Sequence, residues 1–332
     1  MIISRTPFRI SFFGGGTDYP AWYTKNSGQV LATTFDKYSY ISCRLLPPFF
    51  EHKFRLVYSN IETVNHPSEM DHPAAKAVLC ELGQEAGLEI HYDGDLPARS
   101  GLGTSSAFTV GLINAVYALR GQRISSEELA AQALHIEQNV IKEHVGSQDQ
   151  ICAAFGGFNH IKFKRDGSFD VSPMILSKER KQQFESHLML FFTGFSRTAS
   201  KIAKSKIDNF KNREKALLKM HAMVDEAIAI VQRDQTPLEY FGELMHENWE
   251  LKKSLSDQVS TPKIDEIYDV ARSAGAIGGK LLGAGGGGFL CLFVKPETRS
   301  QVQEALKHFI HVPFRFENSG SKIVLYQPNG LG

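Results

Sequence analysis

The residue types best suited to chemistry lie in three glycine-rich segments: FFGGGTDY at 12–19, SGLGTSS at 100–106 and KLLGAGGGGF at 280–289. Glycine adopts positive φ angles and lets the backbone approach a ligand closely. The middle segment directly precedes a helical pattern, so its free backbone N–H groups and the positive end of the helix point to one place. That place suits a phosphate group. For this segment taken alone, a tight turn with a serine helix cap is the alternative.

Charged residues that phosphoryl transfer requires lie near these segments in the sequence. Arg9 is on a strand pattern before the first segment, and Asp18 stands just beyond its glycine turn. Asp149 begins a helical pattern, and Glu137 lies twelve residues earlier. Phosphoryl transfer needs a phosphate cradle, an oxygen ligand for Mg²⁺, a base for the hydroxyl group and a cation. The chain offers a candidate for each, although a solvated or capping role explains each charged residue taken alone.

Two other nucleotide-binding patterns fit poorly. GAIGGKLL at 275–282 has the wrong spacing for the GxxxxGK[ST] loop, and Leu281 follows its lysine. GAGGGG at 283–288 does match GxGxxG, but the strand-like FLCLFV follows it where a dinucleotide-binding fold needs a helix. The NAD-dependent oxidoreductase that this match would indicate is therefore a weak alternative.

The elements that must position these residues are of mixed type. The first half alternates strand and helix patterns, and the second half is rich in Lys, Glu and Ala at helical spacing. Strands are expected at 2–12, 29–45, 54–58, 88–96, 188–194, 287–294 and 322–326, with a hairpin over 157–172 around Asp166-Gly167. Helices are expected at 72–86, 103–119, 125–140 (with a capping box at Ser125 and Glu128), 200–235, 238–254, 261–275 and 297–309. We therefore predict an α+β protein with two domains, residues 1–180 and 181–332.

The composition favours a small-molecule partner. Among 332 residues, 37 Lys and Arg balance 36 Asp and Glu, so we expect neither a nucleic acid nor a membrane partner. The cysteines form no CxxC pair, Arg5 and Arg9 interrupt the N-terminal apolar run, and no apolar stretch approaches the ~20 residues of a bilayer span. We expect a cytoplasmic protein with reduced cysteines, either a monomer or a homodimer.

Taken together and in this order, TPFRISFFGGGTDY, PARSGLGTSSAF and KLLGAGGGGF resemble the three signature regions of the GHMP kinase superfamily (galacto-, homoserine, mevalonate and phosphomevalonate kinases). The middle region, P-x-x-x-G-L-G-[ST]-S-[SA], is the most specific. The resemblance implies the two-domain GHMP kinase fold. Its N-terminal domain is like domain 2 of ribosomal protein S5, its C-terminal domain is ferredoxin-like, and the active site lies between them. ATP and Mg²⁺ are the implied cofactors.

The resemblance also implies roles for individual residues. Asp149 matches the catalytic aspartate that accepts or orients the proton of the attacking hydroxyl, and Arg9 matches the cation that stabilises the developing charge. Ser105 and Glu137 match the Mg²⁺ ligands. The implied ATP-binding residues are Pro97, Ser100, Gly101, Leu102, Gly103, Thr104, Ser105 and Ser106. The implied substrate-binding residues are Gly15, Gly16, Thr17, Asp18, Arg197, Gly285 and Gly286.

Within the superfamily, FRISFFGGGTDYPAW, DHPAAKAVL, EHVGSQDQICAAFGG and FTGFSRTAS resemble the sugar-1-kinases that act on D-glycero-D-manno-heptose 7-phosphate. Galactokinases carry Glu and His where this chain has Gly15 and Gly16, which disfavours galactose. The expected reaction is ATP-dependent phosphorylation of the anomeric hydroxyl to the 1,7-bisphosphate, in nucleotide-activated heptose biosynthesis for surface polysaccharide. A kinase for another sugar, fucose-like or hexose, and a non-catalytic sugar-sensing homologue remain alternatives.

A phosphorylated sugar also needs a cation for its own phosphate. Arg197 is the first candidate, with Lys280, Lys37 and Arg99 behind it. A similarly placed arginine occurs in fucokinase-like relatives, so Arg197 does not discriminate between substrates.

Overall fold

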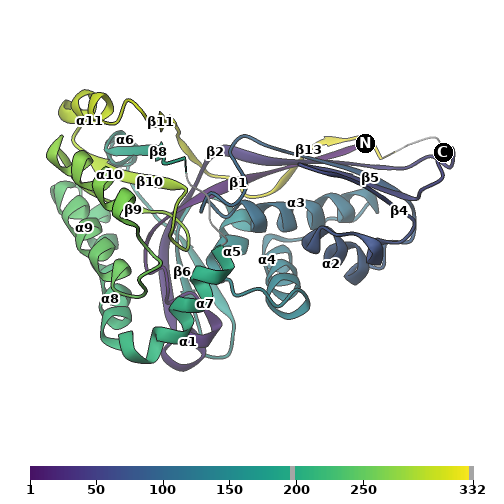
Figure 1. The fold of residues 1–332 in the computed structure, drawn as a ribbon, viewed down its shortest axis with the longest axis horizontal. Coiled ribbons are helices and arrows are strands. Elements are labelled where there is room, and N and C mark those ends of the chain that lie inside the picture. Colours follow the sequence, from purple (N-terminus) through teal and green to yellow (C-terminus); the bar gives the residue numbers. More distant parts are fainter. Residues whose placement is uncertain (195–198, 329–332) are drawn as a thin grey trace.

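The computed structural model describes the backbone of residues 1–194 and 199–328, and the molecule is elongated (Figure 1). A long twisted sheet extends to one end, with helices along one of its faces. A smaller sheet and a group of helices form the other end. The α+β class expected from the sequence is confirmed. Among the described helices, none is both long and apolar enough to cross a membrane.

The larger sheet has nine strands, and its main path runs β13-β1-β2-β5-β3-β4. Strand β2 also pairs with β6 and β12, and β6 pairs with β7. The pair β3–β5 is parallel, and the other pairs are antiparallel. Its strands are β1 (Ile2–Phe13), β2 (Gly28–Leu45), β3 (Phe54–Val57), β4 (Ile61–Val64), β5 (Leu88–Gly94), β6 (Phe158–Phe163), β7 (Phe169–Pro173), β12 (Phe316–Glu317) and β13 (Lys322–Tyr326).

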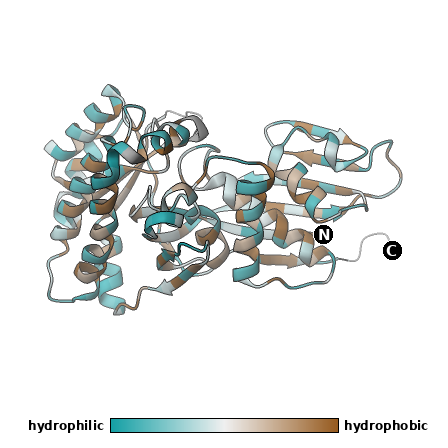
Figure 2. Cartoon of the chain, turned by 90° about the horizontal axis from the view of Figure 1, so that it is seen from below, coloured by the Kyte–Doolittle hydropathy of each residue, from teal (hydrophilic) through white to brown (hydrophobic). Residues whose placement is uncertain are grey.

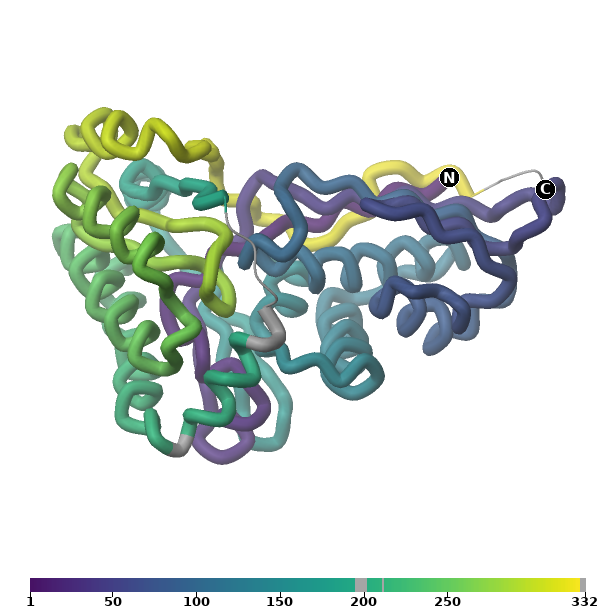
Figure 3. The backbone as a smooth tube through the Cα atoms, viewed as in Figure 1, coloured from purple at the N-terminus to yellow at the C-terminus, as the bar shows by residue number. Residues whose placement is uncertain are grey.

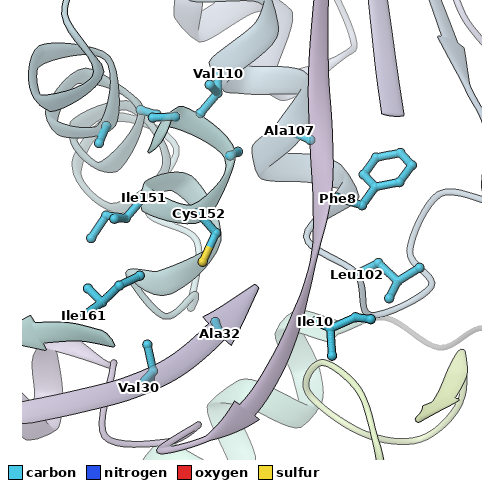
Figure 4. Packing of buried hydrophobic residues seen from close by; sticks show 14 of the residues in the cluster. Phe8, Ile10, Val30, Ala32, Leu102, Ala107, Val110, Ile151, Cys152 and Ile161 are labelled. Atoms are coloured by element: carbon cyan, nitrogen blue, oxygen red, sulfur yellow. The ribbon is translucent and has the colours of Figure 1, made fainter. Parts of the chain in front are cut away.

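One helix dominates the covered face of this sheet. α3 (Thr104–Leu119) packs on β1 and β2 and is apolar on nearly every side, because neighbouring helices cover the faces that the sheet leaves free. Figure 4 shows part of this core, where Ile151 and Cys152 lie near Val30 and Ala32 of β2 and Ala107 of α3. The surrounding helices are α1 (Pro20–Asn26), α2 (Pro73–Glu81), α4 (Ser126–Leu134) and α5 (Gln148–Phe155), with the π-helix η2 (His135–Val140) and the 3₁₀ turn η1 (Pro67–Glu69).

The smaller sheet is antiparallel and runs β11-β8-β10-β9. Its strands are β8 (Leu188–Phe192), β9 (Ala276–Leu281), β10 (Phe289–Val294) and β11 (Ile310–His311). The helices at this end of the molecule carry hydrophobic and hydrophilic residues on different sides (Figure 2). They are α6 (Lys178–Ser186), α7 (Ala199–Asn209), α8 (Glu214–Gln232), α9 (Glu239–Lys253), α10 (Pro262–Ser273) and α11 (Arg299–Ala305), with the 3₁₀ turns η3 (Phe210–Arg213) and η4 (Pro296–Thr298). Of these, α9 and α10 pack on the smaller sheet, and α8 packs on β1 and β2.

The last strands of the chain belong to the larger sheet. β12 pairs with β2 and β13 pairs with β1, so the yellow C-terminal segment lies beside the purple N-terminal strand in Figure 3. The two parts of the chain thus share one sheet, and the division at residues 180 and 181 stays a prediction. The hairpin around Asp166-Gly167 and the capping box of Ser125 and Glu128 are confirmed.

Candidate active site

A cavity of about 330 Å³ lies where the two parts of the chain meet. One wall comes from β1 and from residues 15–19, 99–106 and 143–149. The rest of the lining comes from α7, α9, β9 and the turn that follows β9. All three glycine-rich segments therefore contribute to one hollow, as the sequence predicts.

The loop before α3 presents its backbone to the cavity. Positive φ angles occur at every second residue, 58° at Arg99, 84° at Gly101 and 74° at Gly103, and Gly103 is the N-cap of α3. Such alternation turns successive N–H groups toward one side and forms an anion-binding concavity at the helix N-terminus. Gly101, Gly103, Thr104, Ser105 and Ser106 line the cavity, whereas Ser100 and Leu102 are buried behind it and Pro97 is exposed outside the lining.

The third glycine segment presses against this loop. A Cβ at Gly283 would lie 2.5 Å from the Cα of Gly101, and a Cβ at Gly288 would lie 2.0 Å from the carbonyl oxygen of Ser100. Only glycine permits such contact between two backbones. Gly283 reaches the cavity itself. Gly285 and Gly286 instead lie against Val259, whose carbonyl oxygen accepts a hydrogen bond from the Gly286 N–H (3.0 Å).

Arg9 and Asp149 meet beneath Gly103. Arg9 Nε donates to Asp149 Oδ1 (2.7 Å) and Nη2 donates to Oδ2 (2.8 Å), while Nη1 donates to the carbonyl oxygen of Gly101 (2.6 Å). Burial alone would lower the pKa of Arg9, but the Asp149 carboxylate outweighs it and raises that pKa above its ordinary value. β1 thus fixes the guanidinium group, and the first turn of α5 fixes the carboxylate.

Asp18 is held on the same side of the cavity. Its Oδ1 accepts from the Gly16 N–H (2.8 Å) and its Oδ2 accepts from Gln148 Nε2 (2.9 Å). Burial, with the nearby Asp149 charge, raises the pKa of Asp18. Thr17 does not line the cavity, because its hydroxyl holds the turn by donating to the carbonyl oxygen of Gly14 (2.8 Å). Gly15 and Gly16 do line it.

Glu137 lies behind the phosphate-facing loop, in the π-helix η2. Its Oε2 accepts from Ser106 Oγ (2.9 Å) and from Gln150 Nε2, and burial raises its pKa to about 7. Its Oε1 is buried and no hydrogen bond to it is formed among the described residues, although the Thr109 hydroxyl is close enough to favour the ionised form. Ser105 lines the cavity, but the serine in contact with Glu137 is Ser106. The residues that the structure describes contain no group of three or more His, Cys, Asp or Glu side chains arranged to hold a metal.

Three buried lysines reach the cavity from the second part of the chain: Lys206 on α7, Lys252 on α9 and Lys280 on β9. Of the three, only Lys280 is a candidate from the sequence alone. Lys206 and Lys252 each lie in line with buried apolar residues of their own helix, such as Ala203 and Trp249. A charged residue in an apolar stripe is the signal that could have found them.

The other proposed phosphate-binding cations are placed differently. Arg197 lies outside the described residues. Lys37 pairs with Asp36 (3.2 Å) away from the cavity, and Arg99 is exposed at the cavity's rim.

Two family models and several known kinases match the sequence of this chain. Residues 69–157 match the model of the GHMP kinases N terminal domain, and residues 211–311 match that of the GHMP kinases C terminal domain. The chain is 30% identical to a D-glycero-alpha-D-manno-heptose 7-phosphate kinase of Campylobacter jejuni, over 92% of this chain and 93% of that one. It is 31% identical to a mevalonate kinase of Pyrococcus horikoshii, over 70% and 67% of the two chains.

A solved structure has the same fold. The D-glycero-D-manno-heptose 1-phosphate kinase of Bacteroides thetaiotaomicron superimposes with a TM-score of 0.78 at 24% identity, covering 97% of this chain and 98% of that one.

Proposed function

Since this chain belongs to the GHMP kinase family and is a phosphotransferase, we propose that it transfers the γ-phosphoryl group of ATP to the anomeric hydroxyl of D-glycero-D-manno-heptose 7-phosphate. The product would be the 1,7-bisphosphate, on the route to nucleotide-activated heptose. The family uses ATP as its phosphate donor. The Campylobacter jejuni relative, similar along nearly its whole length, supports the choice of sugar.

The observation that carries the proposal is the Arg9–Asp149 pair, which lies directly beneath the positive end of α3. The triphosphate of ATP occupies the concavity formed by residues 99–106. Each Asp149 oxygen accepts one hydrogen bond from Arg9 and keeps a lone pair for a substrate hydroxyl. The sugar oxygen forms its bond to the γ-phosphorus as the bond to the bridging oxygen of ADP breaks, and Asp149 takes the hydroxyl proton.

Arg9 has two roles in this reaction. Its guanidinium group keeps the Asp149 carboxylate fixed in direction, since two parallel hydrogen bonds define both position and plane. It also places positive charge where negative charge develops on the transferring group, in a buried site where such charge acts strongly. Both roles depend on β1, which holds Arg9 almost completely buried.

The residues near Glu137 fit a magnesium ion. The buried Oε1 has no hydrogen-bond partner among the described residues, and an oxygen of that kind is a suitable ligand for Mg²⁺. Glu137 and Ser105 would hold the ion, which when bound would neutralise phosphate charge. The hydrogen bonds from Ser106 and Gln150 to the other oxygen would orient the carboxylate toward it.

The sugar would lie between Asp149 and the turn at 14–18. Asp18 accepts hydrogen bonds from sugar hydroxyls, and Gly15 leaves room that a side chain would fill, whereas a Cβ at Gly16 would face Leu217. Cytoplasmic location and action as a monomer or homodimer are part of this proposal.

The experiment is ADP release from ATP and Mg²⁺ against a panel of acceptors. The panel holds D-glycero-D-manno-heptose 7-phosphate, sedoheptulose 7-phosphate, D-mannose, L-fucose, D-galactose and mevalonate. We expect selective turnover of the heptose phosphate. Preferential turnover of a free sugar or of mevalonate would overturn the substrate assignment and keep the kinase. ATP binding without turnover of any acceptor would favour a non-catalytic sensor.

A further inference from the structure

We propose that Lys206 and Lys280 form the subsite that holds the substrate's own phosphate, the one that is not transferred. This inference rests on the proposed function, because it requires the acceptor to be a phosphorylated sugar. The two lysines would thus take the role for which Arg197 is the first candidate in the sequence.

Both lysines have unused hydrogen-bond donors inside the cavity. Lys206 and Lys280 are almost completely buried, and both line the hollow. An ammonium group carries three N–H donors. Lys280 uses one, to the carbonyl oxygen of Phe12 (2.8 Å), and Lys206 makes no hydrogen bond with the described residues. Its described interactions are with the ring of Tyr19, whose centroid is 5.5 Å from Nζ, and with the nearby charges of Asp18 and Asp149.

The charged side chains that line the cavity favour the binding of an anion. Four buried cations face it (Arg9, Lys206, Lys252 and Lys280). The carboxylates of Asp18, Asp149 and Glu143 oppose them, and Asp149 is already paired with Arg9. Buried charges without partners are unfavourable. In agreement, burial lowers the pKa of Lys206 to about 8 and that of Lys280 to about 7.

Lys252 is excluded from this subsite by its contacts. Its Nζ donates to the carbonyl oxygens of Leu281 (2.7 Å) and Gly283 (2.8 Å). Two of its three donors are therefore used to hold the turn after β9. Lys252 is a positioning residue of the third glycine segment.

The position of the two lysines favours contact with a phosphate on the sugar over contact with the phosphates of ATP. α7 covers the wall formed by Asp18 and Tyr19, since Phe210, which follows α7, packs on the rings of Tyr19 and Trp22. Lys280 is tied to Phe12, directly before the turn at 14–18. The phosphates of ATP have their own cradle in residues 99–106. A phosphate carried by the sugar would thus meet Lys206 and Lys280.

The test compares Lys206→Met and Lys280→Met with the wild type, on D-glycero-D-manno-heptose 7-phosphate and on the same heptose without its phosphate. Lys204→Met is the matched control, because Lys204 lies on the same helix and is exposed. We expect Lys206→Met to raise the KM for the phosphorylated sugar about 10- to 100-fold, the effect of losing a hydrogen bond between charged groups. The KM for ATP and the kcat/KM for the unphosphorylated heptose should change less than about twofold, and Lys206→Arg should recover part of the loss.

The outcomes separate the two proposals. If the wild type turns over the heptose phosphate but Lys206→Met lowers kcat/KM equally for both sugars, the phosphate subsite is wrong and the proposed function stands. If the wild type does not turn over the heptose phosphate, the proposed function fails. Thermal stabilisation by inorganic phosphate then decides on the subsite. Stabilisation that Lys206→Met and Lys280→Met abolish supports an anion site, and stabilisation unchanged in both variants overturns it.

Discussion

Arg9 and Asp149 face each other through two parallel hydrogen bonds, 2.7 Å and 2.8 Å long, that join the middle of β1 to the first turn of α5. The pair lies at the bottom of the cavity, and the guanidinium group also holds the carbonyl oxygen of Gly101. One cation thus sets the direction of the carboxylate and the position of the loop that faces the phosphates. This arrangement ties the acceptor side of the site to the donor side.

Replacing Asp149 by asparagine tests the chemical role of the carboxylate. We expect Asp149→Asn to lower kcat by about 100-fold or more, because the amide cannot accept the hydroxyl proton. ATP binding should change little, since residues 99–106 are untouched. The measurements are ADP release for kcat and calorimetric titration for ATP. A variant with near-normal kcat would remove Asp149 from the mechanism.

The buried carboxyl group of Glu137 should make the free energy of unfolding of the protein depend on pH. Its pKa rises from 4.5 to about 7 on folding because the carboxyl is buried, so the folded state binds its proton more tightly than the unfolded state. The resulting stabilisation is complete below pH 4.5 and is lost as the pH rises through 7. At about 1.4 kcal/mol per pH unit, this group contributes about 3 kcal/mol to the free energy of unfolding at low pH. Glu137→Gln should flatten that part of the pH profile, measured by denaturant unfolding.

The same group provides a test of metal binding that does not require turnover. Mg²⁺ at the free oxygen of Glu137 would favour the ionised form, so at pH 8 the ion should raise the Tm of the wild type. Glu137→Gln should lose this response, and Ser105→Ala should weaken it. An equal rise in all three proteins would show that the ion binds elsewhere.

The sequence predicted the local elements that carry the candidate site residues. The loop at 97–108, the helix that follows it and the helix that carries Asp149 depend on glycine spacing and apolar periodicity, which are local properties. It failed to find Lys206 and Lys252, because a lysine in a helix is normally a solvated residue and only tertiary packing buries these two. The return of β13 to β1 joins residues more than 300 positions apart, and no local pattern carries that information.

Gly15, in the first glycine-rich segment, has room for a small side chain. A Cβ at Gly15 would lie 3.8 Å from Ser11 Oγ and 3.9 Å from Gln148 Nε2, which is ordinary contact. Gly15→Ala should therefore change the free energy of unfolding by less than about 0.5 kcal/mol. It should nevertheless raise the KM for the sugar about 10-fold, since the added methyl group enters the cavity. Unchanged sugar kinetics would place the sugar away from Gly15.

Gly146 offers the matched contrast. A Cβ there would lie 2.0 Å from Asp18 Oδ2, so Gly146→Ala must displace the carboxylate. We expect a loss of about 1–3 kcal/mol in the free energy of unfolding, together with a fall in kcat/KM for the sugar. Thermal unfolding and ADP release measure the two effects. Normal stability in Gly146→Ala would mean that Asp18 is held less firmly than its two hydrogen bonds indicate.

The contact between the two glycine loops predicts a selective effect on ATP. In Gly288→Ala the new Cβ would meet the Ser100 carbonyl oxygen at 2.0 Å, so the turn after β9 and the phosphate-facing loop must separate. Gly121→Ala is the control, because Gly121 also has a positive φ angle, 69°, but no atom within 4 Å of the added Cβ. Both variants should lose about 1 kcal/mol or more of stability from backbone strain. Only Gly288→Ala should weaken ATP binding, by about 10-fold, because only it distorts the loop that precedes α3. Equal ATP affinity in the two variants would show that the contact serves stability alone.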